Sequence, residues 1–191
     1  MTQRVSAYQR LLDAASRLFY RYGITATGID TIVKEAGVAK KSLYNNFASK
    51  QALISAYLTE RHSEWLSLYE ARLQQAKTAQ ERVMAVFLAY EDHAAQAYGH
   101  GFRGCGLLNA AAESAADSEE RQVVRQHKEQ VEALIYQHVK ELCEHDDVRT
   151  SSIAHHLAFL LEGAMARAGL EGHGACLEQA RAMAVTLLEG L

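Results

Sequence analysis

Apolar residues recur along this chain at spacings of three and four, which is the pattern of amphipathic helices. Together with capping residues and glycine breaks, the spacing predicts helices over residues 4–22, 28–36, 40–47, 50–75, 79–98, 104–115, 118–144, 151–170 and 175–189. No segment favours β structure, and the sequence contains no proline to interrupt a helix. We therefore expect an all-α fold.

The segment 23–53 predicts two short helices around a tight turn, followed by the start of a third. Thr27 is a suitable N-cap for the first short helix, Asp30 places a carboxylate in its first turn, and Gly37 offers the left-handed conformation that ends it. Ser49 is a suitable cap for the third helix. One face of the segment is apolar and should be buried; it consists of Ile29, Ile32, Val33, Ala36, Val38, Leu43 and Phe47.

The opposite face of the second short helix carries two cations, a hydroxyl, a phenol and an amide: Lys40, Lys41, Ser42, Tyr44 and Asn45. Such groups contact phosphates and base edges in the DNA major groove. The exposed amides of the next helix and the ammonium of Lys50 converge where a phosphate could lie. This pattern is typical of a helix-turn-helix that binds DNA, and the alternative is an ordinary solvated helical hairpin with basic residues.

The first 50 residues are basic, although the chain as a whole is slightly acidic. They hold eight Lys or Arg residues against three acidic residues, a net charge of +5, while the whole chain carries −3. The remainder therefore carries −8. A polyanion responds to the local basic patch rather than to the net charge, so this distribution favours DNA binding by the N-terminal part.

Residues 27–53 follow the spaced pattern Thr-x-x-Asp-x-Ile-x-x-x-Ala-Gly-Val-x-x-x-x-Leu-Tyr-x-x-Phe-x-Ser-Lys-x-x-Leu, after a helix with Leu11, Leu12, Ala15, Leu18, Phe19 and Tyr22-Gly23. This pattern resembles the DNA-binding end of the TetR/AcrR transcriptional regulators and covers roughly the first third of the chain. The resemblance implies a homodimeric, all-helical regulator, usually a repressor. Such a regulator releases its operator DNA when a small molecule enters a pocket in the C-terminal domain.

The resemblance also implies roles for individual residues. It assigns contacts with base edges to Lys40, Lys41 and Asn45. It assigns contacts with phosphate to four further residues: Thr27, Tyr44, Asn46 and Lys50.

Three positions depart from the family pattern. Ala39 stands where Ser or Thr usually caps the recognition helix, Lys41 where Gly is common, and Asn46 where His is common. Losing the cap should cost the recognition helix roughly 1 kcal/mol. An additional phosphate or guanine contact by Lys41 can offset this loss, so we expect a base preference that differs from that of better-matched relatives.

The helix pattern and the resemblance together predict two domains. Residues 6–66 form a helix-turn-helix DNA-binding domain that includes the start of a linking helix, and residues 67–191 form a ligand-binding and dimerisation domain. The helix from residue 50 is long enough to leave the first domain and enter the second, which makes it the mechanical link between them.

Two C-terminal helices, near 118–144 and 151–170, carry apolar stripes suited to self-association. The stripes are Val124, Val131, Leu134, Ile135, His138 and Leu142 on the first helix, and Ile153, Leu157, Leu160, Leu161, Ala164 and Ala168 on the second, with Gly163 and Ala166 nearby. Four such helices can form an isologous interface across a two-fold axis. The alternative is that both stripes face the monomer's own core. The resemblance favours a homodimer, because two DNA-binding domains must be held about 34 Å apart to contact a palindrome.

The middle helices are rich in aromatic and flexible apolar residues, which suits a cavity for a small hydrophobic or electrophilic effector. The candidate ligand-binding residues are Trp65, Tyr69, Phe87, Tyr90, Phe102, Cys105, Leu108 and Asn109, with Glu91 and Glu113 as further polar anchors. The alternative for each of these residues is an ordinary place in the core.

Cys105 has a second interpretation. It lies between two glycines, follows Arg103, and is expected at a helix N-terminus, where the helix dipole and a nearby cation favour a reactive thiolate. The protein could then be a thiol-based repressor that senses oxidants or electrophiles, as some members of the family are. The alternative is a small buried cysteine that only packs.

The remaining signals argue against several other classes. No Gly-x-Ser-x-Gly, His-Glu-x-x-His or phosphate-loop motif is present, so we expect neither an enzyme nor a bound cofactor. The three cysteines and nine histidines show no metal-ligand spacing and predict no metal site. No apolar run is long enough to span a membrane and no signal peptide is visible, so we expect a cytoplasmic protein. A helical binding module without DNA activity is the remaining alternative, although it would not need the basic N-terminal part.

Overall fold

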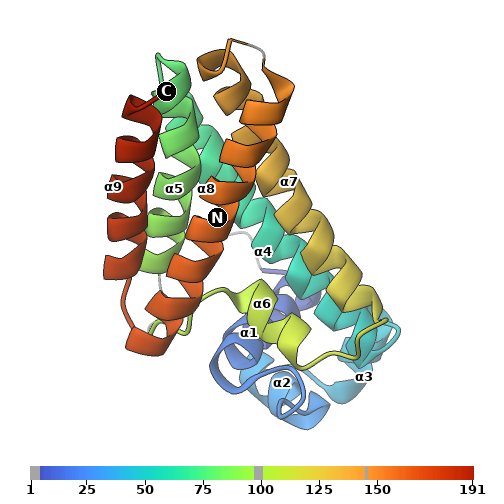
Figure 1. Ribbon diagram of the computed structural model, residues 1–191. Coiled ribbons are helices and arrows are strands. Elements are labelled where there is room, and N and C mark those ends of the chain that lie inside the picture. Colours follow the sequence, from blue (N-terminus) through green and yellow to red (C-terminus); the bar gives the residue numbers. More distant parts are fainter. Residues whose placement is uncertain (1–4, 97–100, 145) are drawn as a thin grey trace. The chain divides into compact units, whose positions relative to one another are not determined.

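The computed structural model describes residues 5–96, 101–144 and 146–191, and every regular element in those ranges is an α-helix (Figure 1). In chain order the helices are α1 (Ala7–Tyr22), α2 (Ile29–Ala36), α3 (Lys40–Asn46), α4 (Lys50–Leu73), α5 (Ala79–Ala95), α6 (Gly106–Ala112), α7 (Glu119–Leu142), α8 (Asp147–Glu171) and α9 (Ala175–Glu189). The predicted all-α fold is confirmed.

Local caps account for helix starts that differ from the prediction. The N-cap of α1 is Ser6, whose hydroxyl accepts a hydrogen bond from the N–H of Gln9 at 3.1 Å. The start of α8 lies earlier than predicted because the Asp146 carboxylate accepts hydrogen bonds from the N–H groups of Val148 and Arg149, each at 3.0 Å. Residue 4 and residues 97–98, which the pattern also assigned to helices, lie outside the described residues.

The chain divides into two compact units. Unit 1 comprises Met1–Arg61 and Gly106–Val124, and unit 2 comprises His62–Cys105 and Arg125–Leu191. Helices α4 and α7 each contribute residues to both units. This division differs from the predicted single boundary after residue 66, because the segment with α6 packs with the N-terminal helices.

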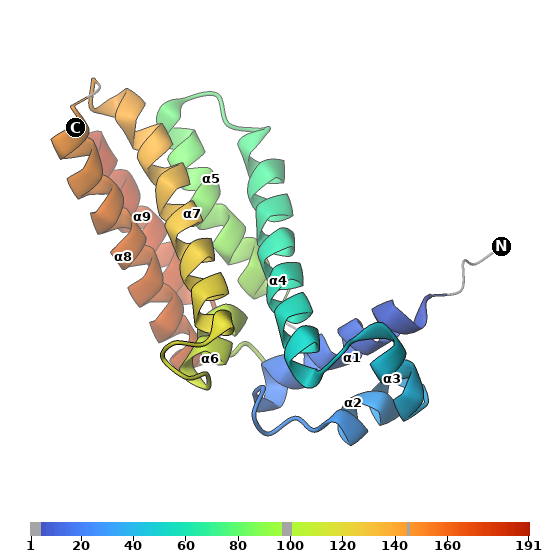
Figure 2. The ribbon, with the colours of Figure 1, turned by 90° about the vertical axis from the view of Figure 1, so that its right-hand side faces the viewer.

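In unit 1, helices α1, α2 and α3 pack around a shared apolar core (Figure 2). Leu43 of α3 is fully buried, and the Phe47 ring stacks on that of Tyr8 with the centroids 4.7 Å apart. Burying one side chain of this size is worth about 1.5–3 kcal/mol. The buried face predicted for the helix-turn-helix segment is confirmed, except that Ile29 and Val38 are only half-buried.

In unit 2, α9 packs against both α5 and α8 in a helical bundle (Figure 2). The largest fully buried side chains of this bundle come from helices α4, α5, α7 and α8: Trp65, Phe87, Tyr90, Ile135, Leu157 and Leu161. The helices of unit 2 are therefore held together mainly by the apolar side chains that they bury between them.

The apolar stripes predicted to form a dimer interface lie mainly inside unit 2. Val131, Ile135, Leu157 and Leu161 are at most 2% exposed and belong to the chain's own core. The prediction that these stripes are free for self-association is therefore wrong, because helical periodicity identifies an apolar face but not the helix that covers it. Other apolar side chains are exposed on the C-terminal helices, namely Phe159 (70%) and Leu170 (87%) on α8 and Met183 (60%) on α9.

Candidate nucleic-acid interface

The turn between α2 and α3 is built around Gly37. Gly37 adopts the left-handed conformation, with φ 61° and ψ 40°, and its N–H donates to the carbonyl oxygens of Lys34 and Val33. The predicted end of α2 is thus confirmed. Helix α3 begins after Ala39 with no side-chain cap, as the departure from the family pattern predicts.

The outward face of α3 gathers most of the side chains that the sequence assigned to DNA contact. Lys41, Tyr44 and Asn45 are exposed, whereas Leu43 of the same helix is buried in unit 1. Tyr44 presents 53% of its surface although it is a large aromatic residue. An ammonium, a phenol and an amide on one short helix can bind phosphate oxygens or base edges.

Lys40 lies on the same helix but is paired with α2. Its ammonium forms an ion pair with the Asp30 carboxylate at 2.7 Å, and both side chains are largely exposed. The hydrogen bond from Asp30 and then its charge raise the pKa of Lys40. Exposed ion pairs contribute little to stability, so exchanging this partner for a phosphate would cost little. The Asn46 side-chain amide is also engaged locally, donating to the carbonyl oxygen of Ser42 at 2.7 Å.

Thr27 has a different role from the one predicted. Its side chain is only 3% exposed, and its hydroxyl donates to the carbonyl oxygens of Gly23 at 2.7 Å and Leu18 at 3.3 Å. The N-cap of α2 is Gly28, which makes no side-chain cap hydrogen bond. The cap prediction for Thr27 is wrong, and the buried side chain does not join the exposed set. Its hydroxyl instead links the segment before α2 to the end of α1 by hydrogen bonds.

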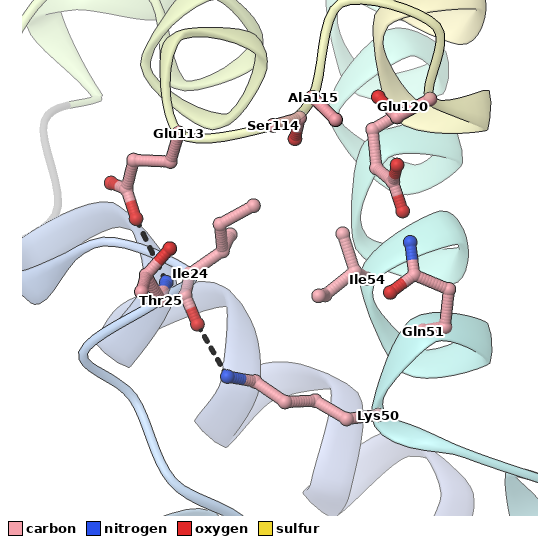
Figure 3. Close-up of a pocket in the computed structure, with 10 residues that line it drawn as sticks. Ile24, Thr25, Lys50, Gln51, Ile54, Glu113, Ser114, Ala115 and Glu120 are labelled. Atoms are coloured by element: carbon pink, nitrogen blue, oxygen red, sulfur yellow. Dashed lines mark hydrogen bonds between the residues drawn. The ribbon is translucent and has the colours of Figure 1, made fainter.

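Lys50 is also engaged within unit 1. Ser49 caps α4 as predicted, because its hydroxyl accepts a hydrogen bond from the N–H of Ala52 at 3.1 Å. The Lys50 ammonium, however, donates to the carbonyl oxygen of Ile24 at 2.6 Å (Figure 3). In the structure, Lys50 therefore links the start of α4 to the loop that follows α1 by a hydrogen bond.

Two arginines of α1 lie beside this helix-turn-helix and were not placed by sequence reasoning. The Arg10 guanidinium donates to the carbonyl oxygen of Gly37 at 2.9 Å, and Arg17 pairs with Glu35 at 3.3 Å. Their partners lie 27 and 18 residues away in the chain. No local pattern signals contacts over such separations; only the total positive charge of the segment pointed to them.

The structure brings together most of the residues proposed for ligand binding. Trp65, Tyr69 and Tyr90 are buried in unit 2, with the Trp65 ring 5.6 Å from that of Tyr69 and 5.4 Å from that of Tyr90. Phe87 and Phe102 belong to the same core. Leu108 and Asn109 lie on α6, which belongs to unit 1, whereas the aromatic group belongs to unit 2.

A polar cluster accompanies these aromatic rings and contains residues that the sequence did not single out. The Lys128 ammonium lies 2.7 Å from a Glu162 carboxylate oxygen, donates to the Tyr90 hydroxyl at 3.3 Å, and lies 3.9 Å from the Cys105 sulfur. Burial raises the pKa of Tyr90. Burial, and next the Lys128 ammonium, lower the pKa of His127 to about 3, so its imidazole is neutral at pH 7. Charged residues on a long helix usually indicate a solvated face, and for that reason this cluster could not be predicted from the sequence.

Within the described parts of the chain, no group of three or more His, Cys, Asp or Glu side chains is arranged to hold a metal ion. None of the helices in those parts is long and apolar enough to cross a membrane.

A family model described as bacterial regulatory proteins of the tetR family matches residues 11–57. A solved structure from Streptomyces coelicolor, SCO4454, described as a TetR-family transcriptional regulator, is similar over the full fold. Its TM-score is 0.81 and its sequence identity 30%, covering 96% of this chain and 93% of that chain.

Curated relatives match the N-terminal part. The transcriptional activator FasR of Mycolicibacterium smegmatis is 35% identical over 92 residues, which is 47% of this chain and 42% of that protein. The transcriptional repressor KstR2 of the same organism is 30% identical over 89 residues, 46% of this chain and 43% of that protein. The chain thus spans less than half of the length of these curated relatives.

Proposed function

This chain belongs to the TetR family of bacterial transcriptional regulators, and from that premise we propose that it is a homodimeric repressor controlled by a small-molecule effector. In this proposal α2 and α3 of each protomer bind half of a palindromic operator. A small hydrophobic or electrophilic effector then binds unit 2 and lowers the affinity for DNA.

The observation that carries the proposal is the outward face of α3. Lys41, Tyr44 and Asn45 are exposed on a short helix whose opposite side, through Leu43, is fixed in the unit 1 core. A rigid scaffold that presents polar and cationic groups on one helix suits insertion into a major groove. The Thr27 hydroxyl and the Lys50 ammonium instead donate to the carbonyl oxygens of Gly23 and Ile24.

Exposed apolar residues on α8 and α9 support the homodimer. Phe159, Leu170 and Met183 each expose 60% or more of their surface to solvent. On α7, by contrast, the exposed positions are mostly polar, as at Gln126 and Glu129. We therefore propose that α8 and α9 form the interface, so that α9 takes the place of the predicted helix near 118–144 and the helix near 151–170, which is α8, is kept.

Unmet hydrogen-bonding groups in the aromatic interior support an effector site in unit 2. The Trp65 indole N–H is buried and has no hydrogen-bond acceptor among the described residues. Nδ1 of His138 is also buried and has no hydrogen-bond partner among them. Buried polar atoms without partners cost free energy unless a bound molecule satisfies them. An aromatic or aliphatic effector with an acceptor oxygen beside Trp65 meets this need.

Salt-dependent DNA binding tests the proposal. We expect the protein to bind promoter DNA flanking its own gene, with affinity that falls as salt rises, measured by fluorescence anisotropy. Lys41→Ala should reduce the slope of log affinity against log salt by about one, because one phosphate contact is lost. Lys77→Ala, an exposed lysine before α5, is the matched control and should leave the slope unchanged. Unchanged binding by both Lys41→Ala and Tyr44→Ala would rule out α3 as the DNA-contacting helix.

A second candidate, a thiol-based sensor, is favoured by one contact. The Lys128 ammonium lies 3.9 Å from the sulfur of Cys105, which is partly exposed, and reactive cysteines occupy such electropositive, partly exposed surroundings. The thiolate sulfur would add to the β carbon of an unsaturated carbonyl compound, and the thiol proton would finally reside on the α carbon. No oxidant is required for this addition.

Modification by N-ethylmaleimide distinguishes this candidate from ordinary effector binding. We expect one adduct at Cys105 by mass spectrometry and a parallel loss of DNA binding, both abolished in Cys105→Ser. Cys176→Ser is the control, because the hydrogen bond to Glu171 raises the pKa of Cys176 and disfavours its thiolate. A Cys105→Ser protein that still loses DNA binding on treatment would eliminate the sensor role.

A further inference from the structure

A cleft of about 410 Å³ lies entirely within unit 1 (Figure 3). Three stretches surround it: the loop after α1, the start of α4, and the connection from α6 into α7. The lining residues that bear on ligand binding are Ile24, Lys50, Ile54, Glu113, Ala115 and Glu120. Its volume falls in the range of small-molecule sites, and its residues are separate from the aromatic interior of unit 2.

Glu120 is the unusual residue of this cleft. Its side chain is only 4% exposed, and its buried Oε1 accepts no hydrogen bond from any residue that the structure describes. Figure 3 shows the carboxylate pointing from α7 into the cleft. A position in the first turn of α7 accounts for a negative charge there, because the helix dipole favours it. It does not account for a buried oxygen without a donor, which costs free energy.

The other charged groups that line the cleft do not neutralise the charge of the Glu120 carboxylate. The Glu113 carboxylate accepts a hydrogen bond from the N–H of Thr25 at 2.8 Å, and the Lys50 ammonium donates to the Ile24 carbonyl oxygen at 2.6 Å. Neither carboxylate forms an ion pair with a side chain in the described part of the chain. Two carboxylates and one ammonium, which is bound to a carbonyl, give the cleft a net negative charge.

We propose that this cleft is a second ligand site, for a small organic cation with a primary amine. An ammonium supplies three N–H donors, enough for the free oxygen of Glu120 and for a further acceptor on Glu113. The methylene groups of such a ligand would lie against Ile24, Ile54 and Ala115, which give the cleft its apolar wall. The bound amine joins the connection between α6 and α7 to the loop that leads into α2.

Putrescine is the probe for this site, tested by isothermal titration calorimetry and thermal unfolding of the full chain without DNA. We expect saturable binding, and a rise in Tm of about 3–6 °C at ten times the Kd. 1,4-Butanediol, which has the same carbon chain but no charge, should not bind.

Two substitutions locate the binding. Glu120→Gln and Glu113→Gln should each weaken putrescine binding at least tenfold. Glu113→Gln retains an oxygen that can accept the hydrogen bond from the Thr25 N–H, so the contacts within unit 1 are kept. Glu119→Gln, which removes an exposed neighbouring carboxylate outside the cleft, should bind as the wild type does. Absence of saturable binding, or equal binding by wild type and both cleft variants, would overturn the proposal. Because the readout does not involve DNA, it is independent of the proposed repressor function.

Discussion

Replacing Phe159 with glutamate is expected to convert the proposed homodimer into monomers and to reduce operator affinity by more than about 100-fold. Phe159 exposes 70% of its surface on α8, although its ring stacks on that of His155 at 6.0 Å. An isologous interface contains each residue twice, and burying one phenylalanine is worth about 1.5–3 kcal/mol. Two introduced carboxylates at the interface add a desolvation cost. The dimer Kd should therefore rise by about 1,000-fold or more.

Analytical ultracentrifugation over a range of concentrations measures the dimer Kd, and fluorescence anisotropy measures operator affinity. Circular dichroism should show an unchanged helical content, because an exposed side chain is replaced. Ala133→Glu, at an exposed position of α7, is the matched control and should remain dimeric. If Ala133→Glu dissociates the dimer and Phe159→Glu does not, the interface involves α7, as the sequence pattern suggested.

Replacing Gly23 with alanine is expected to destabilise the protein by about 2–4 kcal/mol. Gly23 ends α1 with φ 91° and ψ 160°, a backbone conformation that side chains other than hydrogen rarely allow. A Cβ at this position would clash with a carboxylate oxygen of Glu113. Glu113 would have to move and would lose the hydrogen bond from the Thr25 N–H. The expected fall in Tm is about 4–16 °C for a chain of this size.

Thermal and urea unfolding measure this effect. Gly28→Ala is the matched control: φ is −85°, no atom lies within 4 Å of the added Cβ, and we expect a change below about 1 kcal/mol. The double variant Gly23→Ala/Glu113→Ala removes the steric conflict and keeps the backbone strain, so it separates the two causes. A Gly23→Ala protein as stable as Gly28→Ala would show that the loop after α1 adapts without cost.

Much of unit 1 could be predicted from the sequence because its signals are local. The i, i+3 and i+4 spacing identified the buried face that includes Leu43, and Gly37 was identified as the end of α2. The missing cap at Ala39 was equally visible in the sequence. Each of these features depends on residues within one or two helical turns, where the chain itself dictates which groups are neighbours.

The candidate sites were predictable only in part, because their geometry depends on contacts between distant segments. Thr27 was expected at a surface, but its hydroxyl donates to carbonyl oxygens of α1. Lys50 was expected to face outward, but it is held by Ile24. The ion pair between Lys128 and Glu162 could not be predicted, because both are ordinary charged positions on amphipathic helices.

The sequence by itself determined the helices, the helix-turn-helix and the outward set on α3, because periodicity, caps and glycine conformation act over a few residues. Only the tertiary structure decided which apolar stripe is core and which is exposed, and so moved the proposed interface from Ile135 and Leu157 to Phe159. Tertiary structure also decided that Oε1 of Glu120 is buried without a hydrogen-bond donor among the described residues. The physical reason is that the apolar face of a helix shows which side chains need to be buried, whereas the packing of the whole chain determines which other helix or molecule covers that face.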